Sequence, residues 1–296
     1  MKEEIKRKLI QIAAFGFSNS DVSNFAGGRI YHGKWKQFCN PGMNCYSCPA
    51  AKLACPIGAM QAVSGSSNFQ FSFYVVGFIL ALGVLCGRWS CGVVCPFGLL
   101  QELLYKIPFP IRKRIWKPLT YLKYFLLVVF VLWMPVFVTG ALGIGAPAYC
   151  EYICPVGMLE GGIPLLSTHE ELFQTMGGIT LLKSVILALT IVGCLVTERF
   201  FCKVLCPLGA IYGLCNKISF YRLSLQKSSC IHCKKCSVCC PMDIDPVKEQ
   251  NSAECIRCKK CCSVCPTSAL RFGYRRGTQE AVSVATNLVQ KTEERR

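Results

Sequence analysis

Three long apolar segments dominate the pattern of hydrophobic and polar positions along the chain. They run from about Phe71 to Gly87, from about Leu119 to Val138 and from about Ile179 to Val196. An α-helix needs roughly 17–25 mainly apolar residues to cross a bilayer, and each segment meets that length. We therefore predict three transmembrane helices, the second of them kinked at Pro135 because proline removes a backbone donor.

A shorter apolar run, from Leu9 to Phe17, ends at the polar residues 18–21. Three interpretations remain open for this run: an interfacial helix, part of a fourth span, or the core of a signal peptide. No small-residue cleavage site follows it, so we expect the segment to be retained.

Loop charges orient the predicted spans. Between the first two spans, Glu102 is opposed by six basic residues, which are Arg88, Lys106, Arg112, Lys113, Arg114 and Lys117. The next loop contains four glutamates and no basic residue before Lys183. The positive-inside rule then places residues 88–117 and the chain after Glu198 in the cytoplasm, and residues 140–180 outside. Residues 20–68 must also lie outside, although that loop is mildly basic.

Composition adds an unusual feature, because 23 of the 296 residues are cysteine and most have regular C-x-x-C or C-x-x-x-C spacing. This regularity favours metal ligation over disulfides. The formal charge of +17 does not indicate nucleic-acid binding, because the basic residues concentrate beside the apolar runs and bound thiolates are negative. With three histidines and no hydrolase motif, we expect an electron-transfer component rather than a stand-alone enzyme.

Two cysteine runs near the C-terminus share one pattern. Residues 230–241 are CIHCKKCSVCCP and residues 255–266 are CIRCKKCCSVCP. Each fits C-x2-C-x2-C-x3-C-P, the run of two-cluster ferredoxins in which the fourth cysteine ligates the other cluster. We therefore predict two [4Fe–4S] clusters, one held by Cys230, Cys233, Cys236 and Cys265, the other by Cys255, Cys258, Cys261 and Cys240. Zinc, the alternative, favours four cysteines in two pairs. Cys239 and Cys262 fall outside the pattern, and His232 is expected to be a solvated loop residue.

A second repeat, C-x3-C-P-apolar-G, follows each predicted span. It begins at Cys91, Cys150 and Cys202, and Cys55-Pro-Ile-Gly is a partial copy. Proline suits the first position of a helix, glycine permits close packing, and a helix start favours an anionic cluster. We predict one or two further iron–sulfur clusters at the membrane edges.

The orientation assigns thiols to these additional sites. The cytoplasmic set is Cys91, Cys95, Cys202 and Cys206. The outer set is Cys39, Cys45, Cys48 and Cys55, which Cys150 and Cys154 join or partly replace. The alternative is that these thiols only pack in the interior, and we assign Cys194 to that class. Cys86 and Cys215 stay unassigned.

Together these patterns predict a mainly α membrane protein with three or four transmembrane helices and a C-terminal α+β two-cluster ferredoxin domain. The expected divisions are an N-terminal segment with an outer cysteine-rich loop (1–68), a transmembrane domain (69–222), the ferredoxin domain (223–276) and a polar tail (277–296).

With these motifs, residues 29–270 resemble the NapH/NosR-type membrane polyferredoxins. The resemblance implies a multi-pass protein of the bacterial cytoplasmic membrane, with its ferredoxin domain in the cytoplasm. It implies electron transfer between the quinone pool or a cytoplasmic donor, such as a soluble ferredoxin, and a flavo- or haem protein outside. The segment CNPGMNCYSCP at residues 39–49 is more elaborate than the NapH pattern. Lipid is the other expected partner.

Other functions remain open. A quinol-oxidising subunit would need a pocket at the membrane edge, where His32, Tyr31 and Glu102 are polar candidates. A redox or metal sensor would use the same clusters to signal. Copper or iron handling would use the membrane-edge thiols, because soft thiolates suit Cu(I).

Overall fold

The computed structural model describes residues 2–25, 27, 29–65, 73–138, 145–168 and 177–274. The α-helices are α1 (Lys2–Ser18), α2 (Pro56–Ser64), α3 (Phe73–Cys86), α4 (Trp89–Val93), α5 (Pro96–Lys106), α6 (Leu122–Leu126), α7 (Met134–Phe137), α8 (Pro155–Gly157), α9 (Ile163–Thr168), α10 (Gly178–Val196), α11 (Phe200–Val204), α12 (Pro207–Cys215), α13 (Lys235–Val238) and α14 (Lys260–Ser263). Wider or tighter turns are η1 (Val22–Phe25), η2 (Lys34–Gln37), η3 (Lys117–Tyr121), η4 (Leu127–Trp133), η5 (Tyr149–Ile153), η6 (Met158–Gly162) and η8 (Lys227–Ser229).

Two of the three predicted spans are helices with the length and apolar composition to cross a membrane. They are Lys117–Phe137, which joins η3, α6, η4 and α7, and α10. Only 17% of the most apolar window of α10 is buried, so its apolar side chains face outward rather than into a core. In the first predicted span, α3 has 14 described residues, and Phe71 lies outside the described residues.

The second span accommodates Pro135 by a change of helical register. Residues Leu127–Trp133 form a π-helix, and α7 then continues through Pro135. A proline ring clashes with the carbonyl four residues earlier, and a wider turn before it relieves that contact.

The burial pattern of helix α1 is the opposite of that of an amphipathic helix in a soluble protein. Its polar residues Arg7 and Gln11 are buried, whereas Ile5, Leu9 and Ile12 are more than half exposed. Helix α1 packs on α4 and α5. The apolar run in this helix is therefore its outer face, and Arg7 makes the helix part of the packed structure.

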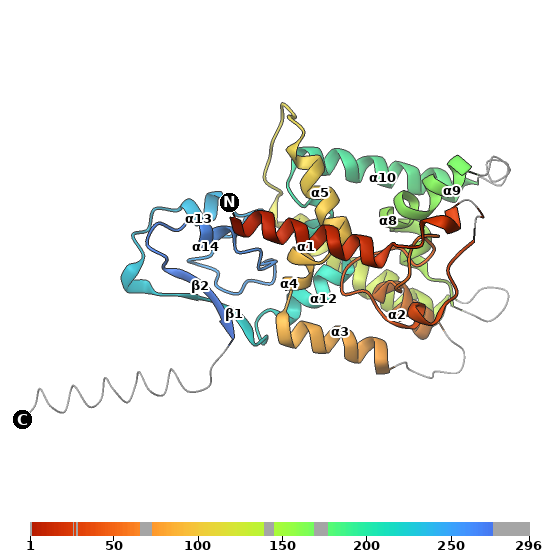
Figure 1. Cartoon of the computed structure of the whole chain (residues 1–296), viewed down its shortest axis with the longest axis horizontal. Helices are drawn as coiled ribbons and strands as arrows, with labels where there is room; N and C mark the ends of the chain where they lie inside the picture. Colours follow the sequence, from red (N-terminus) through yellow and green to blue (C-terminus); the bar gives the residue numbers. More distant parts are fainter. Residues whose placement is uncertain are drawn as a thin grey trace, which may run out of the picture.

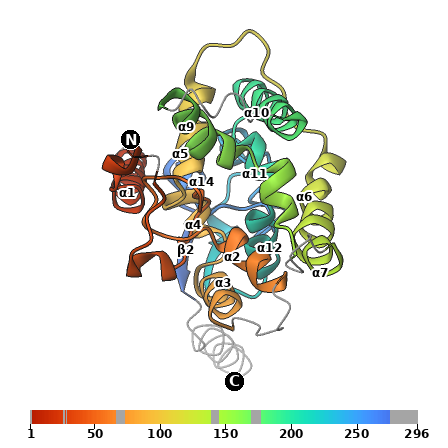
Figure 2. The same ribbon diagram turned by 90° about the vertical axis from the view of Figure 1, so that its right-hand side faces the viewer.

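The long helices surround the short ones. In Figure 1, the axes of α1, α3 and α10 are roughly parallel; α1 begins near α13 and α14 and runs away from them, and α3 and α10 run in the opposite direction. Figure 2 looks from the other end, where α1, α3, α6–α7 and α10 lie at the periphery and α2, α4, α11 and α12 lie between them. The short helices that contain or follow the cysteine motifs therefore occupy the interior of a bundle.

The C-terminal part is a small α+β unit. Strands β1 (Tyr221–Leu225) and β2 (Leu270–Tyr274) pair antiparallel, with Leu223 opposite Phe272. The two cysteine loops repeat one backbone conformation: positive φ angles occur at 232 and 257, at 234 and 259, and at 243 and 268. Each pair is 25 residues apart, so the loops are structural copies. His232 is exposed, as expected for a solvated loop residue.

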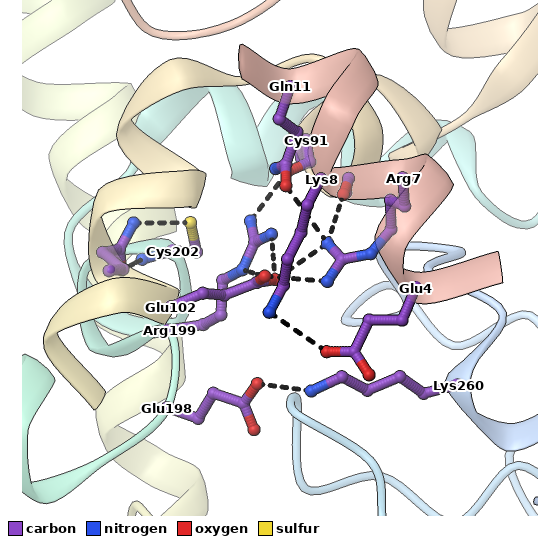
Figure 3. Close-up of polar contacts among 12 residues, drawn as sticks. Glu4, Arg7, Lys8, Gln11, Cys91, Glu102, Glu198, Arg199, Cys202 and Lys260 are labelled. Carbon is purple, nitrogen blue, oxygen red and sulfur yellow. Dashed lines mark hydrogen bonds and ion pairs between the residues drawn. The ribbon is translucent and has the colours of Figure 1, made fainter. Parts of the chain in front are cut away.

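A buried charge network joins α1 to the interior helices (Figure 3). Glu102 on α5 pairs with Arg7 at 2.7 Å and with Arg199 at 2.6 Å. Burial opposes ionisation of Glu102, but Arg199 and Arg7 lower the pKa of its carboxyl from 4.5 to about 2. The two arginines also donate to the carbonyls of Gly92 (Arg7, 2.8 Å) and Cys91 (Arg199, 2.7 Å). The network therefore fixes the backbone at the first thiol motif.

Replacing Glu102 by glutamine should lower the free energy of unfolding at neutral pH by about 3–5 kcal/mol, because two buried arginines lose their counter-charge. Since the folded-state pKa is depressed, the stabilisation by Glu102 is complete above about pH 4.5 and is lost as the pH falls towards 2. Denaturant unfolding of the detergent-solubilised protein measures both effects. As a control, Glu4→Gln removes an i,i+4 contact to Lys8 and should cost at most about 1 kcal/mol. Equal losses in the two variants would contradict this account.

Candidate iron–sulfur sites

The cysteine that precedes proline in each C-P-apolar-G segment begins a helix. Cys55, Cys95, Cys154 and Cys206 are N-caps with extended backbone, and the proline takes the first helical turn. All four thiols are buried. Of the four sulfurs, that of Cys206 makes a cap hydrogen bond, accepting the backbone amide of Gly209 at 3.3 Å. The sequence motif thus places four buried sulfurs at the starts of helices.

The predicted cytoplasmic set comes together in the structure. Cys91, Cys95, Cys202 and Cys206 line one cavity with about 290 Å³ of empty space, together with Met43, Phe97 and Phe201. These four thiols, called site A, come from α4, α11 and the starts of α5 and α12. The spacing argument and the orientation of the spans had selected the same four residues.

Two arginines give site A a positive environment. Arg88 and Arg199 are fully buried; Arg88 donates to the carbonyl of Cys202 at 3.1 Å and pairs with Glu254 at 3.0 Å. Burial raises the pKa of the Cys91 thiol to about 11, against the opposing effect of the two guanidinium groups. The Cys91 thiol is therefore protonated near neutral pH unless a metal replaces the proton, and the cations favour a bound anion.

Glycine leaves room for these arginines. A Cβ atom added to Gly98 would collide with the guanidinium of Arg199, and one added to Gly209 would lie 3.0 Å from that of Arg88. The glycine of C-P-apolar-G is thus required at site A by the arginines. Arg88 and Arg199 were not among the predicted site residues, although both stand in the pattern R-x-x-C-x3-C-P.

A second group, called site B, consists of Cys45, Cys55, Cys150 and Cys154. The Cys154 thiol is close enough to those of Cys150, Cys55 and Cys45 for their charges to interact. A Cβ atom added to Gly157 would lie 3.7 Å from the sulfur of Cys45, and one added to Gly58 would lie 3.9 Å from that of Cys150. Both C-P-apolar-G glycines at this site thus border a thiol.

The other two predicted outer thiols lie at the margin of site B. Cys48 packs with Ala50 and Ala51, next to Cys45, and Cys39 pairs with Ala54 through a backbone bridge. That Cys150 and Cys154 replace Cys39 and Cys48 as ligands stays a prediction.

The ferredoxin thiols are positioned unequally. Cys240, Cys255, Cys258 and Cys261, called site C, line one cavity with about 340 Å³ of empty space. This is one of the two predicted crossed sets. In the other set, called site D, Cys236 is buried in the same small core as Cys261, Cys233 is exposed, and Cys230 and Cys265 are half-buried. Ligation by site D stays a prediction.

The donor sets fit iron–sulfur clusters. Among the described residues, no three His, Cys, Asp or Glu side chains converge as ligands of one metal ion. Sites A and C each gather four thiols around a closed space, and amides or cations face the sulfurs of site A. Cysteine thiolates hold [4Fe–4S] clusters in this stoichiometry, and the surrounding hydrogen bonds and charge set their potentials.

Buried residues connect the sites in series. Tyr149 has its ring beside the thiols of Cys154 and Cys206, and its hydroxyl donates to the carbonyl of Leu205 at 3.0 Å. Tyr149 therefore links site B to site A. Ile256, inside the second ferredoxin loop, is buried and its carbonyl packs on Gly92. Ile256 therefore links site A to site C.

Cysteine substitutions distinguish ligands from packing thiols. Cys95→Ala and Cys206→Ala should each remove about four iron atoms per chain, and the double variant no more than either, because one cube is lost. Cys55→Ala and Cys154→Ala should behave in the same way for site B. Iron and sulfide analysis of anaerobically purified protein measures the losses.

Matched controls exist for both sites. Cys194→Ala near site A and Cys48→Ala near site B should keep the full iron content. Iron loss in Cys48→Ala without loss in Cys150→Ala would reject the set assigned to site B.

Comparison with known proteins agrees with this chemistry. A family model described as a 4Fe-4S binding domain matches residues 68–118, 125–166 and 180–225. The uncharacterized protein MJ0750 of Methanocaldococcus jannaschii is 30% identical over 205 residues, which cover 66% of this chain and 76% of that protein. The methylamine utilization ferredoxin-type protein MauN of Methylorubrum extorquens is 26% identical over 56% of this chain and 50% of its own length. The regulatory protein NosR of Pseudomonas aeruginosa is 27% identical over 56% of this chain and 22% of its own length.

No solved structure matches the chain. The chain spans half or less of the named relatives MauN and NosR, and about three quarters of MJ0750. With the shared domain, the coverage of MJ0750 and the thiol sites, the chain belongs to the family of membrane-associated, ferredoxin-type 4Fe–4S electron-transfer proteins.

Proposed function

We propose that the chain conducts electrons across a bacterial cytoplasmic membrane, between a cytoplasmic donor and a redox protein at the outer face. The observation that carries this proposal is the series of thiol sites D, C, A and B, joined through Cys261, Ile256 and Tyr149. When bound, an iron–sulfur cluster at each site supplies a one-electron carrier. A hydrocarbon core about 30 Å thick favours several closely spaced carriers over a single transfer.

The bundle surface supports a membrane location. The segment Lys117–Phe137 has exposed aromatic residues at both ends: Tyr121, together with Trp116 just before the segment, at one end, and Trp133 at the other, as in the aromatic belts of spanning helices. The exposed apolar face of α1 and the parallel course of α1, α3 and α10 in Figure 1 support four spans. The end that carries the ferredoxin part also carries the basic loop before Lys117, which supports a cytoplasmic position for it.

The ferredoxin part offers a surface for an acidic donor. Lys234, Lys235 and Lys259 are exposed, whereas Lys260 pairs with Glu198 at 2.8 Å. Complementary charge accelerates association between redox partners and is sensitive to salt. An acidic soluble ferredoxin is therefore the proposed donor, and a flavo- or haem protein is the proposed outer acceptor.

The conduit is tested in vesicles that hold the full chain with its ferredoxin part outward and a trapped ferricyanide acceptor. Reduced ferredoxin added outside should reduce the trapped acceptor, and Cys95→Ala should abolish this transfer because the series is broken at site A. Cys194→Ala is the matched control and should keep the rate. Equal rates in the wild type and Cys95→Ala would contradict the proposal.

A second candidate function, quinol oxidation, is favoured by one pocket. A hollow with about 540 Å³ of empty space lies beside Cys258 and is lined by Ile10, Trp89 and Lys259, among others. It lies where α1 meets the ferredoxin part and could receive an amphiphilic ring. Glu102, a polar candidate from the sequence, is instead bound between two arginines and does not accept protons near neutral pH.

A quinol analogue added anaerobically to the oxidised, detergent-solubilised protein separates the two functions. The conduit account expects no bleaching of the cluster absorbance within the time in which reduced ferredoxin bleaches it. Rapid bleaching that is slowed at least tenfold in Trp89→Ala would favour quinol oxidation at this pocket.

A further inference from the structure

In each of the four C-P-apolar-G segments, the residue six positions after the cysteine lies at a thiol site. These residues are Gln61, Gln101, Glu160 and Tyr212. Residues three or four apart lie on the same face of a helix. The N-cap cysteine, the glycine three residues later and the residue six positions later therefore lie on one side of each helix. Three of the four are fully buried and Glu160 is half-buried. Two of them are glutamines, one at each bundle site.

Gln101 contacts site A through both ends of its amide. Its Nε2 donates to the sulfur of Cys202 at 3.2 Å and to the carbonyl of Phe97 at 3.3 Å. Its Oε1 accepts the backbone amide of Cys202 at 3.4 Å. One side chain from the Cys95 helix therefore holds both the sulfur and the backbone of a thiol from the other motif.

Gln61 makes the same contacts at site B. Its Nε2 donates to the sulfur of Cys150 at 3.2 Å and to the carbonyl of Ile57 at 3.2 Å. Its Oε1 accepts the backbone amide of Tyr149 at 2.9 Å. In both sites the glutamine reaches the first cysteine of the C-x3-C-P motif on the opposite segment. The same glutamine-to-sulfur contact occurs at two separate sites. A chance contact is therefore a poor explanation.

The two contacts of each amide have different physical consequences. The acceptor contact positions the backbone of the opposite segment. The donor contact reaches a sulfur that is negative when it ligates iron, and such hydrogen bonds strengthen in a buried, low-dielectric site. An N–H group directed at a ligand sulfur stabilises the more negative, reduced cluster and so raises its reduction potential.

We propose that Gln61 and Gln101 are a matched pair of residues that set the reduction potentials of site B and site A, through N–H donation to Cys150 and Cys202. The proposal rests on the proposed function only in requiring clusters at these two sites. The glutamines also position the opposite thiol segment through their carbonyl oxygens.

Two variants at each position separate the donor from the acceptor role. Gln101→Met removes both contacts, whereas Gln101→Glu keeps an oxygen for the Cys202 amide and loses the donor. Full-length protein, purified anaerobically in detergent, is titrated with a redox mediator series while the reduced clusters are followed by electron paramagnetic resonance. The site A signal is the one that disappears in Cys95→Ala, and the site B signal the one that disappears in Cys154→Ala.

Both Gln101 variants should shift the reduction equilibrium of the site A signal at least tenfold towards the oxidised form, or about 59 mV for one electron, and leave the site B signal unmoved. Gln61→Met and Gln61→Glu should shift the site B signal towards the oxidised form and leave the site A signal unmoved. Each glutamine therefore serves as the control for the other. Iron content should stay at the wild-type level in the two glutamate variants.

Two results would overturn the proposal and are distinguishable from each other. Unmoved potentials in iron-replete Gln61→Glu and Gln101→Glu would show that the glutamines only pack against the thiol segments, while the proposed function stands. Full iron content in Cys95→Ala and Cys154→Ala would show that sites A and B hold no cluster, and the proposed function would fail together with the inference.

Discussion

A cysteine at the N-cap of a helix, with proline in the first turn, is the constraint on which the interior of the bundle depends. The backbone is extended at Cys55, Cys95, Cys154 and Cys206, where each helix begins, and proline has no amide of its own to leave unpaired. The following glycine then admits an arginine at site A and a thiol at site B. Four copies of the C-P-apolar-G segment thus contribute to two interior thiol sites.

Buried cations complete the interior. Fully or nearly fully buried basic groups include Arg7, Arg88, Arg199, Lys123 and Lys203, and the acidic groups that meet them are Glu102, Glu254 and Asp243. Positive groups outnumber negative ones in this network. An unbalanced buried charge is costly, and the anionic cluster proposed at site A would supply the missing negative charge. Part of the formal charge of +17 therefore serves the interior as well as the topology.

Regular spacing explains which parts of the site could be predicted from the sequence. Site A and site C follow from short repeats whose geometry is local, and two spans follow from apolar length. The grouping of thiols at site B did not follow, because it depends on the path of residues 39–55, which brings Cys45 and Cys55 to Cys154. Arg88, Arg199 and the two glutamines act through contacts more than 80 residues apart in the chain, which no window of sequence displays.

The number and type of iron centres in the full chain tests the four-site series most directly. Mössbauer spectroscopy with iron and sulfide analysis, on protein purified without oxygen, measures both. The series predicts about 16 iron atoms per chain, all in [4Fe–4S] cubes, four cubes being held by sites A, B, C and D. About eight iron atoms, confined to the two ferredoxin clusters, would contradict it, because the bundle thiols would then be only packing groups.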